Sequence, residues 1–140
     1  VDGAKAHDLP AALELLRRAD LPEDGVVEQF GNYFAARDDA RLVGLCGLEV
    51  HVPDGLLRTV VVDPQYRGEG VGARLIDFAL ALARKMELAG VYLLTTTAHD
   101  YFLKRGFADC SREAAPAGIR DAWEFKTGCT QKASFMKLAL

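Results

Sequence analysis

Leucines near the start of the chain recur at the spacing of an amphipathic helix. They fall on one face between residues 8 and 19, and Asp8 stands where an N-cap residue is preferred. We therefore predict a helix over residues 8–19. A loop over residues 21–25 and a second, short helix over residues 26–30 are expected to follow.

Three apolar stretches downstream are predicted strands joined by short turns. They cover residues 33–37, 41–52 and 56–63, and the turns between them fall at residues 38–39 and 53–55. The third stretch contains three consecutive valines, which is typical of a strand buried on both faces. Connections this short predict an antiparallel β-meander.

The second half of the chain alternates between strand and helix patterns. A glycine-bearing loop at residues 64–72 leads into an amphipathic helix at 71–88, a strand at 91–97 and a short helix at 98–105. Further assignments are helix-ending glycines at Gly90 and Gly106, a strand start at 107–110, an irregular segment at 111–131 and a last strand at 133–140. This order predicts one α/β domain over residues 1–140, with a mixed, mostly antiparallel sheet and flanking helices.

Composition narrows the class of protein. With 140 residues, 50% of them hydrophobic and 26% charged, the chain is large enough to fold around its own core. The formal net charge of −3 argues against nucleic acid as a partner. No apolar run approaches the ~20 residues that span a membrane, so we expect no membrane partner. The chain starts at Val1 rather than methionine, which leaves open whether residues precede it.

The cysteines indicate a reducing environment. Cys46, Cys110 and Cys129 are widely separated and odd in number. Such spacing is untypical of a disulfide framework or of a CxxC metal site. We therefore expect reduced thiols, no bound metal and a cytoplasmic location.

The most informative segment is the loop from Arg67 to Gly72, which reads Arg-Gly-Glu-Gly-Val-Gly. It joins a buried strand to the long helix, so its backbone N–H groups and the helix dipole can meet at one anion. A P-loop would need a lysine that this loop lacks. A dinucleotide site would need a GxGxxG pattern within parallel βαβ units, whereas the preceding strands form a meander. The third interpretation is the pyrophosphate of coenzyme A.

This loop, with Val-Asp-Pro before it at residues 62–64, resembles motif A of the GNAT N-acetyltransferases, [Q/R]-x-x-G-x-[G/A]. The strand at 91–97 and the Lys-Arg-Gly-Phe turn at 104–107 resemble the same family. The resemblance covers the chain from about residue 8 onward. It implies a GNAT fold and acetyl-CoA as the co-substrate. It also implies a splay between the strands at 56–63 and 91–97 that admits the thioester.

The resemblance assigns the coenzyme A site to two stretches of backbone. The amides of residues 68–73 would hold the pyrophosphate, and the strand edge at 60–62 would pair with the pantetheine arm. An amide there, that of Val61 or Val62, would polarise the thioester carbonyl. The implied cofactor-binding residues are Val60, Val61, Val62, Arg67, Gly68, Glu69, Gly70, Val71, Gly72, Ala73 and Phe102.

Two features of the family's catalytic pattern are missing. Where many GNATs have a tyrosine that protonates the leaving thiolate, this chain has Phe102, so the neighbouring Tyr101 is the candidate general acid. Where many have a glutamate early in the central strand, this chain has Arg58 and Thr59. Candidate bases elsewhere are Glu49, His51 and His99. The predicted catalytic set is Tyr101, Glu49 and the amide of Val61.

The lack of an evident base favours an amine that is already neutral. A lysine-type amine with a pKa of about 10.4 is only ~0.1% neutral near pH 7.5, whereas an α-amine of pKa about 7.8 is roughly one-third neutral. We therefore favour the α-amino group of a small molecule. Arg58 and Arg120 are candidates for binding its carboxylate, because arginine binds such groups bidentately.

The stretch Leu-Leu-Thr-Thr-Thr-Ala at residues 93–98, followed by the turn at 104–107, resembles the amino-acid N-acetyltransferases that acylate glutamate. Together with the tail at 128–136, it is also similar to small stand-alone GNATs associated with arsenic resistance. Both resemblances imply an amino acid or an amino-acid-like substrate. The predicted substrate-binding residues are Arg58, Thr59, Thr95, Thr96 and Arg120.

Other functions stay open at this point. A protein or peptide acetyltransferase would need a broad open groove, and a non-catalytic acyl-CoA sensor would bind coenzyme A without turnover. A nucleotide-phosphate binder would prefer ATP or NAD to acetyl-CoA. The last strand, at 133–140, is by resemblance a candidate homodimer interface.

Overall fold

The computed structural model describes residues 2–19, 23, 26–27, 30–95, 98–120 and 134–140, without the side chain of Thr59. The chain divides into two units. The first consists of Val1–Glu49 and Thr59–Leu82, and the second of Val50–Arg58 and Ala83–Leu140.

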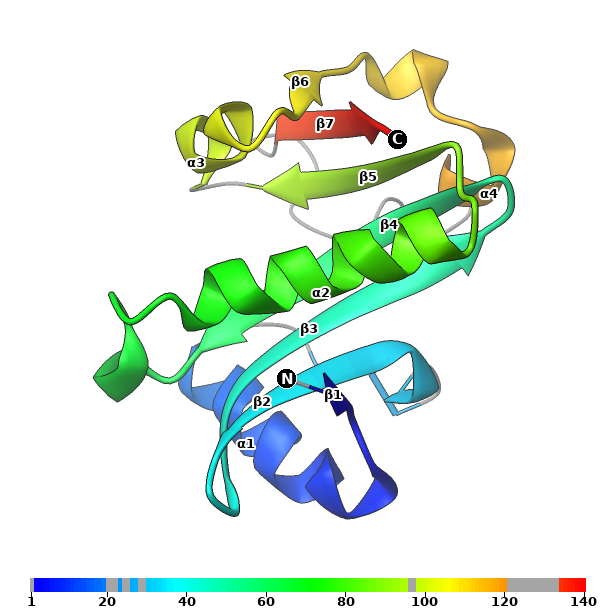
Figure 1. The fold of residues 1–140 in the computed structure, drawn as a ribbon. Helices are drawn as coiled ribbons and strands as arrows, with labels where there is room; N and C mark the ends of the chain where they lie inside the picture. Colours follow the sequence, from blue (N-terminus) through cyan, green and yellow to red (C-terminus); the bar gives the residue numbers. More distant parts are fainter. Residues whose placement is uncertain (1, 20–22, 24–25, 28–29, 96–97, 121–133) are drawn as a thin grey trace. The chain divides into compact units, whose positions relative to one another are not determined.

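The sheet of the first unit is antiparallel. β1 (Asp2–Gly3) pairs with β2 (Tyr33–Asp38), and β2 pairs with β3 (Arg41–His51) (Figure 1). The C-terminal end of β4 (Asp54–Val62) comes next in the strand order. The predicted meander is therefore present in this unit.

Two helices cover the two faces of this sheet. α1 (Leu9–Arg18) shares a buried cluster with Ala35 of β2 and Leu45 of β3. α2 (Val71–Lys85) lies against the neighbouring position on β3, where a Cβ on Gly44 would come within 2.9 Å of its side chains. Because adjacent residues of a strand point to opposite faces, the two helices pack on opposite sides. The coverage explains why β3 is buried from residue 42 to residue 49.

The second unit contains a parallel pair and an antiparallel pair of strands. The start of β4 runs parallel to β5 (Gly90–Thr95), and β7 (Ser134–Ala139) runs antiparallel to β5 along its whole length. The short β6 (Ala108–Asp109) adds to β7. The described part of this unit beyond β5 also contains three short helices: α3 (His99–Lys104), η4 (Arg112–Ala114) and α4 (Ala117–Arg120). Its core joins Leu56, Tyr92, Ala115, Ile119 and Phe135.

The parallel register of β4 and β5 is short. Among the described residues it pairs 54–56 with 90–92, although β5 continues to Thr95 and β4 continues through Arg58 within the same unit. The predicted splay requires β4 and β5 to pair only at their beginnings and to separate further along, which agrees with this short ladder.

The predicted end of the long helix is wrong. α2 stops at Lys85 instead of residue 88, and Glu87 takes the positive φ of 59° that leads out of it. Gly90 is not a helix cap, because it is the first residue of β5 and pairs with Ala139. A side chain there would be crowded, since a Cβ would lie 3.2 Å from the backbone oxygen of Leu138.

Other boundaries differ by smaller amounts. β4 starts at Asp54 rather than residue 56, because the turn lies at residues 52–53. The segment predicted as irregular contains η4 and α4, and its part beyond residue 120 lies outside the described residues. The predicted short helix at 26–30 is described only in part, and a 3-10 helix, η2 (Phe30–Asn32), begins at its end. Among the described residues, no helix is both long and apolar enough to cross a membrane.

Candidate functional site

The glycine-bearing loop starts at a buried carboxylate. Asp63 is 1% exposed, and its Oδ1 accepts a hydrogen bond of 2.9 Å from the backbone N–H of Gln65. Its Oδ2 accepts from Arg41 of β3 at 2.9 Å and from Arg18 of α1 at 3.4 Å. The bond from Gln65 lowers the pKa of Asp63, burial opposes this, and Arg41 lowers the pKa further. The carboxylate therefore stays ionised and holds the start of the loop to two other elements.

The middle of the loop requires glycine for conformational reasons. Gly68 and Gly70 have φ values of 83° and 80°, which L side chains rarely adopt. Crowding is not the reason, because a Cβ on Gly68 would meet nothing within 4 Å and one on Gly70 would lie 3.9 Å from Arg74 Nη1. Gly72 is already part of α2, and a Cβ there would make an ordinary contact of 3.6 Å with Val62.

The loop runs directly into the N-terminus of α2. The bond from the N–H of Arg74 to the oxygen of Gly70, 3.0 Å long, belongs to the first turn of the helix. In an α-helix the N–H groups before such a bond have no acceptor within the helix, which here means residues 70–73. These amides and the positive end of the helix dipole suit an anion.

Side chains around the loop are mostly exposed. Arg67, Glu69 and Arg74 are all exposed, and Arg74 donates to the backbone oxygen of Glu69 at 3.5 Å. Tyr66 donates a hydrogen bond of 2.7 Å to Asp38 on β2, and its ring lies 5.8 Å below the guanidinium of Arg41. The strand that precedes the loop is more buried: Val61 packs in the α1 cluster, and Val60 and Val62 are half-buried.

In the second unit, α3 presents a tyrosine beside an arginine. Tyr101 is 41% exposed, and its hydroxyl accepts a hydrogen bond of 3.4 Å from Arg105. The guanidinium of Arg105 also lies 5.7 Å from the centre of the tyrosine ring. Phe102, by contrast, is 6% exposed and packs edge-on against Phe107. Its ring has a packing role in the core of this unit.

A comparison with known protein families identifies the family to which this chain belongs. The family described as "Acetyltransferase (GNAT) domain" matches residues 29–109, which is more than half of the chain. The chain belongs to the GNAT acetyltransferase family.

Curated relatives of this GNAT chain are named amino-acid acetyltransferases. One from Mycobacterium tuberculosis is 34% identical over 82 residues, covering 58% of this chain and 47% of the relative. One from Pseudomonas putida is 28% identical over 134 residues, covering 88% of this chain and 31% of the relative. The chain thus spans less than half the length of these relatives.

Solved structures share the GNAT fold. N-acetylglutamate synthase from Neisseria gonorrhoeae, complexed with coenzyme A and N-acetyl-glutamate, superposes with a TM-score of 0.87 at 20% identity. It covers 99% of this chain, which in turn covers 34% of that protein. Rv2747 from M. tuberculosis, in complex with CoA, gives a TM-score of 0.83 at 24% identity and covers 99% of this chain and 97% of that protein. The predicted family and fold class are confirmed.

The predicted substrate residues of this GNAT chain lie in different surroundings. Thr95 at the end of β5 is half-buried, and its hydroxyl accepts a hydrogen bond of 3.0 Å from the N–H of Ala98. Arg58 is 3% exposed, whereas Arg120 is exposed at the end of α4. The side chain of Thr59, and Thr96 as a whole, lie outside the described residues.

The candidate bases also differ from one another. Glu49 is 5% exposed at the end of the buried part of β3. His51 is half-buried beside α4, and a Cβ added to Gly118 of that helix would lie 3.1 Å from the Cβ of His51. His99 bonds through Nε2 to Asp109 at 2.8 Å, which raises the pKa of the histidine and favours its protonated form.

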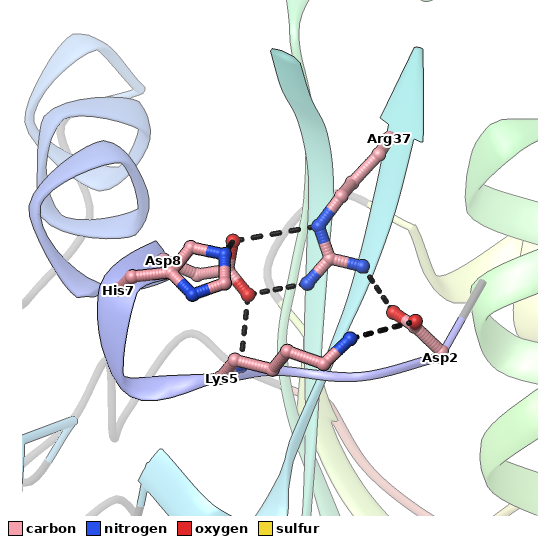
Figure 2. Close-up of polar contacts among 5 residues, drawn as sticks. All are labelled: Asp2, Lys5, His7, Asp8 and Arg37. Atoms are coloured by element: carbon pink, nitrogen blue, oxygen red, sulfur yellow. Dashed lines mark hydrogen bonds and ion pairs between the residues drawn. The ribbon is translucent and has the colours of Figure 1, made fainter. Parts of the chain in front are cut away.

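The structure adds two carboxylate clusters that sequence reasoning missed. One is the Asp63 cluster described above. The other joins Asp8 to Arg37 of β2 and to the N–H of Lys5, with Asp2 on the far side of the same guanidinium (Figure 2). An Asp-Pro-Gln sequence at residues 63–65 is a signal for the first cluster, since Asp often caps the turn that follows it. No local signal exists for the ion pair of the second cluster, because Arg37 is 29 residues from Asp8.

Proposed function

We propose that this GNAT chain binds acetyl-CoA at the loop of residues 67–73 and transfers its acetyl group to the α-amine of a small amino acid. The observation that carries the proposal is the loop itself. Two glycines with positive φ, Gly68 and Gly70, lead into α2, and the N–H groups of residues 70–73 have no acceptor within that helix. Such a group of N–H donors suits a pyrophosphate, and the names of the relatives support an amino acid as the acceptor.

The proposed reaction is a direct attack. The neutral amine attacks the carbonyl carbon of the thioester, so a C–N bond forms and the C–S bond breaks. The nitrogen loses a proton to a base or to water, and the coenzyme A thiolate takes up a proton. The Val61 amide is the proposed donor to the developing oxyanion, Tyr101 the proton donor and Glu49 the proton acceptor.

Tyr101 suits the role of proton donor because of its neighbour. Its oxygen accepts a hydrogen bond from Arg105, so its own O–H proton is not used in that contact. The guanidinium of Arg105 also lies over the tyrosine ring, 5.7 Å from its centre, and helps to hold the side chain in place. Phe102, at the position where many family members have the tyrosine, is buried and carries no proton to give.

The wider assignment follows from the same proposal. Residues 1–140 act as one acetyltransferase domain, because the matched region 29–109 includes residues of both units. Its acceptor is an amino acid or a close analogue, and an arsenic-containing analogue is one member of that class. A reducing cytoplasmic location agrees with the free thiols of Cys46 and Cys110. A homodimer through β7 (Ser134–Ala139) is the assembly to test.

A calorimetric titration tests the binding step. The wild-type protein is expected to bind acetyl-CoA, and Gly70→Leu is expected to bind it at least tenfold more weakly, because the side chain stands on the anion-facing loop. Gly106→Ala is the matched control. It imposes the same kind of strain, of about 1–2 kcal/mol, at another positive φ (96°) outside the loop, and should bind like wild type. Absence of acetyl-CoA binding by the wild-type protein would refute the proposal.

A thiol-release assay tests the acceptor. L-glutamate, L-glutamine, an arsenic-containing amino acid analogue and a peptide with a free N-terminus are each supplied with acetyl-CoA. Release of thiol with a free amino acid, and acetylation of its α-amine by mass spectrometry, is the expected result. Turnover with the peptide alone would assign a peptide acetyltransferase, and binding without any turnover would assign a sensor.

A further inference from the structure

We infer that Asp63 is a positioning residue for the coenzyme A loop: it holds the loop amides in place for the pyrophosphate without touching it. This inference rests on the proposed function and names a residue outside the family's glycine motif. Asp63 lies at the boundary between β4 and the loop, where its backbone N–H donates to Val43 at 2.8 Å. Both its main chain and its side chain are therefore bonded.

The side chain of Asp63 joins three elements of the first unit. It accepts from Gln65 at the start of η3 (Pro64–Tyr66), from Arg41 on β3 and from Arg18 on α1. The backbone oxygen of Asp63 accepts from the N–H of Tyr66 at 2.8 Å and completes the turn. The first half of the loop is thereby fixed to the sheet and to α1.

The second half of the loop has far less support. Residues 67–70 are exposed, and a Cβ added at Gly68 or Gly70 would meet no atom closer than 3.9 Å. Glycine loses more conformational freedom on ordering than other residues. The amides of residues 71–73 belong to the first turn of α2, whereas the direction of the amides of residues 68–70 depends on the residues just before them, that is on the turn which Asp63 holds.

The arginines around Asp63 also offset the charge of its carboxylate. A buried carboxylate next to an anion site would repel a pyrophosphate. Arg41 and Arg18 offset that charge, and the exposed Arg67 and Arg74 add positive charge on the loop and on α2. Asp63 can thus act as an anchor while the loop keeps its preference for anions.

Asp8 provides a matched control within the same unit. Like Asp63 it is buried, at 6% exposed, and it accepts from a backbone N–H, that of Lys5 at 2.8 Å, and from an arginine, Arg37. None of these partners lies in the loop of residues 63–73. Loss of Asp8 therefore removes a similar set of bonds from the first unit without removing a hydrogen bond of the loop.

The experiment measures dissociation constants for two ligands. Acetyl-CoA is titrated calorimetrically into wild type, Asp63→Ala, Asp63→Asn and Asp8→Ala. S-acetylpantetheine, which has the same thioester but no pyrophosphate, is measured by competition. Asp63→Ala is expected to bind acetyl-CoA at least tenfold more weakly and S-acetylpantetheine within twofold of wild type. Asp63→Asn, whose amide oxygen can still accept from Gln65, should stay within threefold for both.

Several results would overturn the inference. Equal affinities of Asp63→Ala and Asp8→Ala for acetyl-CoA, or a loss in Asp63→Ala that is the same for both ligands, would mean that Asp63 only supports the fold. Should Asp63→Ala not fold, Arg41→Gln decides, with three- to fivefold weaker binding of acetyl-CoA expected and no change refuting the inference. A wild-type protein that binds neither ligand refutes the proposed function instead, so the two failures are distinguishable.

Discussion

Two buried aspartates in the first unit have nearly the same surroundings and different consequences. Asp8 accepts from the N–H of Lys5 and from Arg37, and Asp63 accepts from the N–H of Gln65 and from Arg41. In Figure 2 the Arg37 side chain reaches from β2 to Asp8 on one side and to Asp2 on the other. Every partner of the Asp8 cluster belongs to the N-terminal segment or to β2, whereas Asp63 also bonds to the loop that enters α2.

The comparison shows that the role of a hydrogen-bonded carboxylate depends on the segment of the chain that it holds in place. At Asp8 the bonds tie the start of α1 to a strand, and we expect them to contribute mainly to stability. At Asp63 the same bonds fix the turn before the two glycines with positive φ. Variants that separate stability from ligand affinity can therefore distinguish the two clusters.

The largest expected effect is on the stability of the first unit, which contains both aspartates. Leu16 is fully buried in the α1 cluster, and Leu16→Ala should lower the free energy of unfolding by about 2–5 kcal/mol. Denaturant unfolding measures the loss. The affinity for acetyl-CoA should stay within twofold where the variant is folded, because no loop residue is changed. If the affinity for acetyl-CoA fell together with stability, general destabilisation would be enough to weaken binding. The proposed difference between the Asp8 and Asp63 clusters would then be contradicted.

The two arginines should separate stability from binding. Arg37→Gln removes a cation that contacts both Asp8 and Asp2, so it should lower the unfolding midpoint more than Arg41→Gln does. Arg41→Gln should weaken acetyl-CoA binding three- to fivefold, since Arg41 contacts Asp63 and covers the Tyr66 ring. Thermal unfolding and calorimetry on both variants test the pair. Equal effects of the two substitutions on affinity would contradict the account.

Acid should weaken both clusters in the same direction. At Asp8 burial opposes ionisation, but the hydrogen bonds from Arg37 and Lys5 outweigh it and lower the pKa; at Asp63 the bond from Gln65 lowers the pKa. A carboxyl with a depressed folded-state pKa stabilises the fold above its ordinary value of 3.8 and loses that contribution as the pH falls through the folded-state pKa.

Denaturant titrations between pH 6 and pH 3 measure this dependence. Wild type should lose stability as the pH falls, and Asp8→Asn and Asp63→Asn should each show a shallower slope, by up to one bound proton. A slope that neither substitution changes would mean that these two carboxyls have ordinary pKa values.

The smallest effect is expected at Tyr66. Tyr66→Phe removes its hydrogen bond to Asp38 but keeps the ring under Arg41. We expect less than a twofold change in the dissociation constant of acetyl-CoA, because the bond lies at the protein surface, where water replaces it. A calorimetric titration checks this, and a tenfold change would move the main anchor of the loop from Asp63 to Tyr66.

Much of the fold could be predicted from local patterns. The helical spacing near residues 9–18, the β-meander and the glycine loop before α2 each depend on neighbours in sequence. Gly106 ends α3 with a φ of 96°, as a C-cap glycine does. The family resemblance rests on the loop and the turn at 104–107, and the family match confirms it.

The remaining features depend on contacts that no local pattern contains. Gly90 has the sequence context of a helix cap, but the reason for the glycine is the backbone of β7, much further along the chain. Arg41 and Arg18 reach Asp63 from 22 and 45 residues away. The burial of Phe102 and the raised pKa of His99 depend in the same way on Phe107 and Asp109. The roles predicted for the catalytic and substrate residues stay predictions.

The most direct test of the central claim follows the backbone amides themselves. A ¹⁵N-labelled sample is titrated with acetyl-CoA, and the amide resonances are recorded by two-dimensional NMR. The account predicts that the largest shifts belong to residues 68–73, whose N–H groups would change from water to pyrophosphate as acceptor. Shifts elsewhere with these resonances unchanged, or no shifts at all, would contradict the proposal that this loop binds the co-substrate.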